Sequence, residues 1–87
     1  MTDESLLTFP CELPIKVVGR NSAAFRDVTS TIVRKHYADI AVARTSEQSS
    51  RNGAYVSLTF VVRAESREEV DALYRELTSM DEIVMVL

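Results

Sequence analysis

The stretch from Ala54 to Ala64, AYVSLTFVVRA, decides the fold because it places an apolar residue at every second position. Successive side chains of an extended strand point to opposite faces, so this alternation sends one set of residues into a core. The core set is Val56, Leu58, Phe60 and Val62, and the opposite set is Tyr55, Ser57, Thr59, Val61 and Arg63. The segment is therefore predicted to be a half-buried strand with a second layer packed on one face.

A helix and a last strand are predicted after this segment. The residues Ser66-Arg67-Glu68-Glu69 form a capping box, in which the serine caps the N-terminus of a helix. Apolar residues then recur at the spacing i, i+3, i+4, i+7 of one helix face, namely Val70, Leu73, Tyr74 and Leu77. Residues 83–87, IVMVL, are short and rich in β-branched residues, and they predict a strand that is apolar on both faces.

A hairpin is predicted on the other side of residue 54. Residues 40–48 alternate, with Ile40 and Val42 on one face and Ala41 and Ala43 on the other. The polar residues that follow end in Asn52-Gly53, a pair that tolerates positive φ and is typical of turns. The two alternating segments are therefore expected to pair as antiparallel neighbours.

The first strand and the first helix are predicted from residues 13–36. Leu13 to Arg20 alternates, with Ile15 and Val17 on its core face. Asn21 and Ser22 are both suitable N-caps, and residues 34–36 carry the positive charge that suits a helix C-terminus. The helix between them presents Phe25, Val28 and Ile32, with Ala24 and Thr29, at helical spacing.

The predicted order of elements, βαββαβ, is that of a ferredoxin-like α+β sandwich. In this topology the right-handed crossovers place both helices on one face of a four-stranded antiparallel sheet, with the first and third strands in the centre. Residues 1–12 are expected to be a loose N-terminal segment, and residues 13–87 a single domain. The other sheet face is left open, and it carries Lys16, Val18, Ala41, Ala43, Tyr55, Ser57, Thr59 and Val61. Such a face is a common place for a partner, a second copy or a ligand, or it is simply solvated.

Composition excludes several classes of protein. The 87 residues carry a net charge of −3, the wrong sign for a protein that binds nucleic acid phosphates or an anionic membrane. A single cysteine, Cys11, excludes an internal disulfide framework. The acidic N-terminal residues and the lack of a long apolar run predict neither a signal peptide nor a membrane span. We therefore expect a cytoplasmic protein, with neither nucleic acid nor a membrane as its partner.

No set of residues has the spacing of a catalytic or metal site. His36 and Cys11 lack sequence neighbours that would complete a nucleophile–base pair or a set of metal ligands. The acidic residues of the last third have the pattern of a solvated helix face. We therefore expect no enzyme activity, no metal and no cofactor.

The turn Gly19-Arg20-Asn21-Ser22 is the most suggestive segment. Free backbone N–H groups at a helix N-terminus, together with an arginine, can bind a carboxylate or a phosphate, although the same residues also suffice as a turn and a cap. Acylphosphatases share this topology and hold phosphate in this turn beside a Phe-Arg pair. Here Gly19 lies too far along the chain from Phe25-Arg26 for that signature, so this enzyme class has little support.

RNA recognition motifs also share the fold. The segment Arg51 to Leu58 falls where the signature octamer of that family would lie, and Arg51, Ala54, Tyr55 and Val56 fit it. However, Gly53 and Leu58 replace residues that would stack on bases, and the first strand offers no ring. An RNA-binding module on the open face is therefore kept as the alternative function.

Over nearly its whole length the chain resembles the YbeD family, small bacterial proteins of unassigned biochemical activity. The matching segments lie at both ends and in the strands between them. They are Leu6-Leu7-Thr8-Phe9-Pro10, Ile15-Lys16-Val17-Val18-Gly19, Tyr55-Val56-Ser57 with Ala64 and Glu69-Val70, Leu73-Tyr74-Arg75-Glu76-Leu77 and Val84-Met85-Val86-Leu87.

The resemblance implies a non-catalytic module. The YbeD family is similar in fold to ACT domains, regulatory modules that bind amino acids near the turn after the first strand, and it is loosely associated with lipoate metabolism. By this similarity Gly19, Arg20 and Asn21 are the predicted ligand-binding residues. A regulatory or adaptor module without an attached enzyme domain is expected to bind a small metabolite, a protein partner or both. A homodimer through the second or last strand is one way in which it could assemble.

Overall fold

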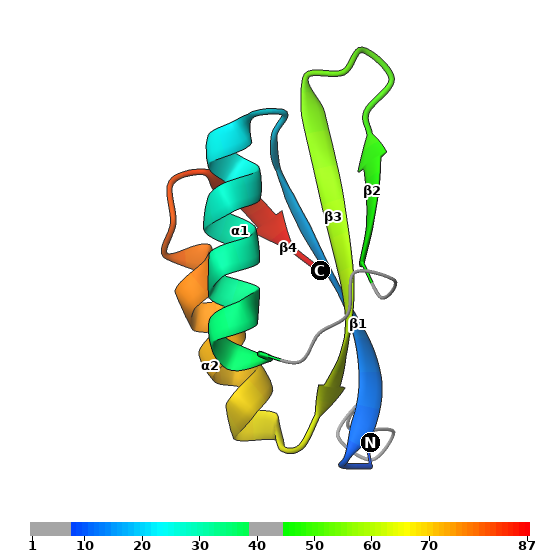
Figure 1. The fold of residues 1–87 in the computed structure, drawn as a ribbon, viewed down its shortest axis with the longest axis vertical. Coiled ribbons are helices and arrows are strands. Elements are labelled where there is room, and N and C mark those ends of the chain that lie inside the picture. The colour runs from blue at the N-terminus through cyan, green and yellow to red at the C-terminus, as the bar shows by residue number, and fades with distance from the viewer. Residues whose placement is uncertain (1–7, 39–44) are drawn as a thin grey trace, which may run out of the picture.

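The computed structural model describes residues 8–38 and 45–87. Its elements run β1 (Cys11–Arg20), α1 (Ala23–His36), β2 (Thr45–Ser49), β3 (Tyr55–Ala64), α2 (Arg67–Thr78) and β4 (Ile83–Val86). The two helices lie together on one face of the sheet, as Figure 1 shows. No helix among these residues is long and apolar enough to cross a membrane.

The four strands form one antiparallel sheet in the order β2-β3-β1-β4. The central strands β1 and β3 pair along their full ten residues, from Cys11 opposite Ala64 to Arg20 opposite Tyr55. The predicted ferredoxin-like βαββαβ sandwich, with its first and third strands in the centre, is confirmed.

Both helices begin at serine caps, as their sequences predict. The Ser22 side chain accepts a hydrogen bond from the N–H of Phe25 at 3.1 Å, and that of Ser66 accepts one from the N–H of Glu69 at 3.2 Å. The returning bond of the capping box is shifted by one residue, because the Glu69 carboxylate accepts from the N–H of Glu65 at 2.9 Å. At each helix start, a backbone N–H group of the first turn is thus hydrogen-bonded by a residue close in sequence.

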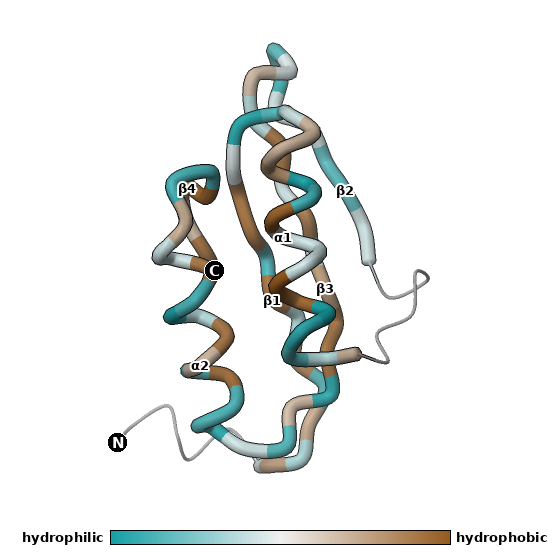
Figure 2. Tube along the Cα trace, turned by 60° about the vertical axis from the view of Figure 1, so that its left-hand side comes forward, coloured by the Kyte–Doolittle hydropathy of each residue, from teal (hydrophilic) through white to brown (hydrophobic). Residues whose placement is uncertain are grey.

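The core lies between the sheet and the helices. Its largest fully buried apolar side chains come from all the longer elements, and they are Phe25, Ile15, Leu73, Leu77, Val17, Val33, Val56 and Val62. Apolar positions recur along β1, β3 and both helices, whereas β2 is largely teal and pale in Figure 2. The alternation of the segment 54–64 is confirmed, since its four predicted core residues are all buried.

The strand boundaries differ from those predicted by one residue in β3 and β4, and by more in β1 and β2. β1 begins at Cys11 and not at Leu13, because Cys11 and Glu12 continue the ladder opposite Ala64 and Arg63. The predicted strand at residues 40–48 falls partly outside the described residues, and β2 covers Thr45–Ser49. The hairpin turn is as predicted, with Gly53 at a φ of 76°.

Gly19 is required by packing at the end of β1. A Cβ atom at this position would overlap the ring of Phe25 and lie 2.6 Å from the carbonyl oxygen of Glu82. The ring is fully buried, so it has little room to move away. The first helix therefore approaches the sheet closely because residue 19 has no side chain.

We predict that Gly19→Ala lowers the free energy of unfolding by about 1–3 kcal/mol, as other overpacking substitutions do. Urea denaturation of the purified protein measures this loss. The matched control is the double variant Gly19→Ala, Phe25→Leu, in which the smaller side chain relieves part of the overlap. Its loss should be less than the sum of the two single losses, and strict additivity would show that the ring contact is not the cause.

Candidate functional site

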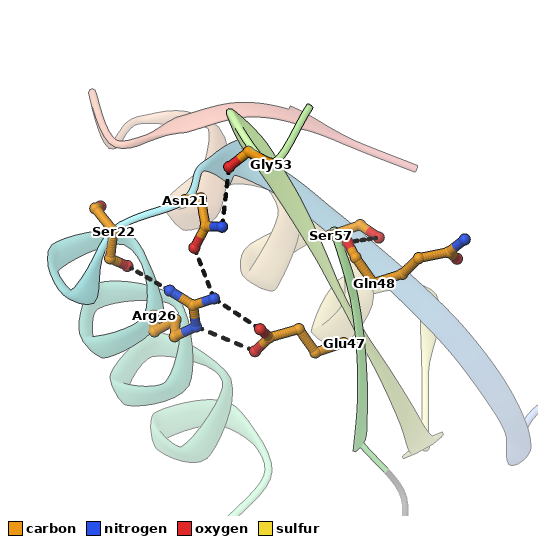
Figure 3. A network of polar contacts seen from close by, with 7 residues as sticks. All are labelled: Asn21, Ser22, Arg26, Glu47, Gln48, Gly53 and Ser57. Atoms are coloured by element: carbon orange, nitrogen blue, oxygen red, sulfur yellow. Dashed lines mark hydrogen bonds and ion pairs between the residues drawn. The ribbon is translucent and has the colours of Figure 1, made fainter. Parts of the chain in front are cut away.

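The turn between β1 and α1 is held by hydrogen bonds to the tip of the β2–β3 hairpin. The backbone N–H of Asn21 donates to the carbonyl oxygen of Ala54, and its side-chain amide donates to that of Gly53, each at 3.0 Å. The Asn21 side-chain oxygen accepts from Nη2 of Arg26 at 2.8 Å, as Figure 3 shows. Asn21 thus joins the turn to the hairpin through its backbone N–H and its side-chain NH2, and to α1 through its side-chain oxygen.

Arg26 extends this network to the edge strand β2. Its guanidinium donates to both carboxylate oxygens of Glu47, from Nε at 3.1 Å and from Nη2 at 2.7 Å. Its Nη1 donates to the carbonyl oxygen of Ser22 at 3.2 Å. The hydrogen bonds from Arg26 lower the pKa of Glu47, and the same pairing raises the pKa of Arg26. This bidentate pair ties α1 to β2, and it leaves Arg26 poorly placed to bind a phosphate.

The three predicted ligand residues lie in different surroundings. Gly19 is buried against Phe25, and the Asn21 side chain is hydrogen-bonded to Gly53 and Arg26. Arg20 is exposed on the open face of the sheet, where its guanidinium lies 5.6 Å from the centre of the Tyr55 ring. Ligand binding at these residues stays a prediction. Arg20 and Asn21 are both exposed, but the Asn21 amide is already hydrogen-bonded to Gly53 and Arg26.

Arg20 continues a row of cross-strand pairs on the open face. Along β1 and β3 these pairs are Lys16 with Thr59, Val18 with Ser57 and Arg20 with Tyr55. Neighbouring positions on one face of a strand are separated by two residues, so the Cα atoms of Lys16 and Arg20 stand about 13 Å apart with Val18 between them. The row combines two positive charges, an apolar centre, hydroxyl groups and one aromatic ring.

A shallow hollow of about 270 Å³ lies on this row, beside the end of the hairpin. It is lined by Lys16, Val18, Gln48, Ser49, Ser50, Tyr55, Val56 and Ser57. The Ser57 hydroxyl donates to the carbonyl oxygen of Gln48 at 3.4 Å, which joins the wall of the hollow to its floor (Figure 3). None of the lining residues is acidic, although the whole chain carries a net charge of −3.

Little in the sequence indicates this hollow. Lys16, Val18, Tyr55 and Ser57 are predicted for the open face, but the contribution of Gln48 to Ser50 depends on the pairing of β2 with β3, which sets Gln48 opposite Ser57. The signal that could have found it is the pair of cations four residues apart on one strand face, with no acid between them.

His36 joins the two helices through Glu76. His36 Nε2 lies 2.8 Å from Oε1 of Glu76, and Nζ of Lys35 lies 3.0 Å from the other oxygen of that carboxylate. These contacts join the end of α1 to α2, and they lower the pKa of Glu76, with the hydrogen bond from His36 as the larger cause. Cys11 is a free thiol on β1. Within residues 8–38 and 45–87, no three histidine, cysteine or acidic side chains are placed to hold a metal.

Comparison with known proteins identifies the family. The sequence profile of a family described as "Protein of unknown function (DUF493)" matches residues 4–87. The chain belongs to this family. A UPF0250 protein of Nitrosomonas europaea is 39% identical over the full length of both chains, and one of Hahella chejuensis is 37% identical over 93% of this chain and 89% of its own. The predicted membership of this group of small bacterial proteins, the YbeD family, is confirmed.

A solved structure agrees with the fold. The solution structure of protein HP0495 from H. pylori superposes with a TM-score of 0.65, over all of this chain and 94% of that one. The sequence identity is 13%, so this similarity bears on the fold alone. It supports the ferredoxin-like fold of this chain.

The Arg26–Glu47 pair predicts an acid-dependent loss of stability. The pKa of Glu47 is lowered in the folded protein from an ordinary value of 4.5. The contribution of the Glu47 carboxylate to the stability of the fold is therefore fully present above pH 4.5. It is lost as the pH falls through the lowered pKa of the folded protein. In Glu47→Gln we expect a lower melting temperature at pH 7 and a smaller further decrease on acidification than in the wild type.

Thermal unfolding followed by circular dichroism between pH 7 and pH 3 measures this difference. Glu65→Gln is the matched control, because Glu65 forms a longer ion pair with Arg63, 3.4 Å, between two exposed side chains. If both variants follow the same pH profile, the bidentate pair is not what links stability to acid.

Proposed function

We propose that this DUF493 protein is a non-catalytic module that binds a small metabolite, one with a carboxylate and an apolar body, in the hollow on the open sheet face. The observation that supports this most directly is the local charge. Lys16 and Arg20 flank Val18 on one face of β1, on a chain that is acidic overall. A local positive potential of this kind attracts an anion.

The proposed site matches the two parts of such a ligand. Lys16 is an exposed cation on the rim of the hollow, and it can pair with a carboxylate in solvent. Val18 and Tyr55 offer an apolar surface to the rest of the ligand, and Ser57 adds a hydroxyl. Because the hollow is shallow and open, we expect moderate affinity and ready release, as a sensor of metabolite concentration requires.

The regulatory role rests on family resemblance together with this site. The similarity to ACT domains favours a module that binds a metabolite and reports it to a protein partner. The loose association of the YbeD family with lipoate metabolism makes lipoate and octanoate the first probes, since each joins a carboxylate to an apolar chain. The predicted residue Arg20 lies beside the hollow, over the ring of its lining residue Tyr55, while Gly19 and Asn21 would act by holding the turn in place.

The RNA-binding alternative has less support. Tyr55 is the one aromatic residue that the described strands place on the open face, and Arg20 lies over its ring. Modules that read single-stranded RNA stack two or three bases on such rings. A single exposed ring on an acidic chain therefore favours a small ligand over a nucleic acid.

Titration with octanoate and lipoate, followed by NMR chemical shifts of the backbone amides, tests the proposal. We expect shifts at β1 and at the hairpin end of β3. Lys16→Gln should weaken binding about tenfold, the size of effect that follows from losing a charged hydrogen bond. Tyr55→Ala should weaken it as well, because the ligand loses an apolar surface.

Lys35→Gln is the matched control, since Lys35 is also exposed but lies on the helical layer and pairs with Glu76. It should bind like the wild type. A folded Lys16→Gln or Arg20→Ala variant with undiminished binding would remove that residue from the site. Salt-dependent binding of an RNA oligomer that Tyr55→Ala abolishes would favour the alternative function.

A further inference from the structure

The two edge strands of the sheet differ in how well their side chains protect them from pairing with another chain. Edge strands expose unpaired backbone groups, and proteins usually shield them with charged or polar side chains. β2, TSEQS, has four exposed residues out of five, all of them polar, and Glu47 is held there by Arg26. β4, IVMV, has no charged residue and no proline. Within the described part of the chain, the apolar edge is thus the one at β4.

The exposed side chains of β4 and the residue after it are large and apolar. Val84 is 56% exposed, Met85 46% and Leu87 59%. Together with Tyr55 these are all the large exposed apolar residues within residues 8–38 and 45–87. Three of the four therefore gather at one edge of the sheet, and such a concentration marks an interaction surface.

The backbone of this edge is available for pairing. Leu87 exchanges two hydrogen bonds with Lys16, at 2.8 and 3.1 Å, so its N–H and C=O point toward β1. Bonded and non-bonded pairs alternate along an antiparallel ladder. Val86, opposite Val17, therefore points its N–H and C=O away from β1. No further strand follows β4 in the described sheet.

The charge beside this edge decides between two kinds of occupant. Asp81 and Glu82 directly precede β4, and both are exposed. Neither takes part in an ion pair with another described residue. A second copy of the chain would bring another net charge of −3 and a second acidic pair to this edge. A segment with basic residues would instead meet opposite charge there.

We propose that β4 accepts an extended apolar segment of a partner protein, flanked by lysine or arginine, which adds to the sheet as a fifth strand. Main-chain hydrogen bonds to Val86 would supply affinity, as in other cases of strand addition. Met85 and Leu87 would pack against alternate apolar side chains of the segment, and Asp81 and Glu82 would select its basic flank. This surface lies beside the hollow proposed for a metabolite, because Met85 and Leu87 pair across the ladder with Val18 and Lys16.

A pair of synthetic peptides tests the proposal. Both carry five alternating valines and threonines, and one has two lysines at each end while the other has two glutamates. Backbone amide shifts of the labelled full-length protein report where each peptide binds. We expect shifts in β4 with the lysine peptide, and at least tenfold weaker binding of the glutamate peptide at low salt. This difference should shrink as the salt concentration rises.

Two variants serve as test and control. Val84→Lys places at the edge the kind of charge that protects natural edge strands, and it should weaken binding of the lysine peptide at least tenfold. Because Val84 is exposed, the variant should keep the fold, which its amide spectrum verifies. Ser46→Lys, on the polar edge strand β2, should bind like the wild type.

Three results would overturn the proposal. The first is equal binding of the two peptides. The second is a set of shifts confined to β2 or to the hollow. The third is self-association of the protein in analytical ultracentrifugation that Val84→Lys abolishes, because a second copy would then be the occupant of β4.

Discussion

The ten-residue antiparallel pairing of β1 with β3 is the constraint on which the rest of the structure depends. Because both strands alternate without interruption, one register fixes two surfaces at once. It puts Ile15, Val17 and their partners under the helices, and it puts Lys16, Val18 and Arg20 on the open face. A slip of one residue would exchange the two faces, burying two cations, so the core and the candidate site are specified together.

The elements that the sequence predicts well are those fixed by local chemistry. The serine caps of both helices, the Asn-Gly turn and the alternation of the central strands each depend on residues within a few positions of one another. The start of β1 was predicted two residues late, because Cys11 and Glu12 join the strand through the ladder to β3 and not through a pattern of their own. Pairing with a distant strand can extend a segment beyond its local preference.

The candidate site divides in the same way. Lys16, Tyr55 and Ser57 follow from alternation alone, whereas the contact of Arg26 with Glu47 joins residues 21 positions apart. That contact requires the hairpin to lie beside the start of α1, which Asn21 secures through Gly53. No periodic pattern in the sequence predicts a contact between residues so far apart. For the same reason the sequence does not show that Asn21, predicted as a ligand residue, hydrogen-bonds the β1–α1 turn to the β2–β3 hairpin.

The two proposed surfaces share one strand. The hollow contains Lys16 and Val18, and the same two residues pair in the ladder with Leu87 and Met85 of the apolar edge. A module that reports a metabolite to a partner needs its two sites to influence each other's binding free energy. Adjacent strands offer a short route, because a strand added beside β4 restricts β4, which in turn restricts the backbone of Lys16. A ligand held by Lys16 would act on this backbone from the other side. If both proposed sites are occupied, the arrangement would couple them without a change of fold, through β1 and the bonds between Lys16 and Leu87.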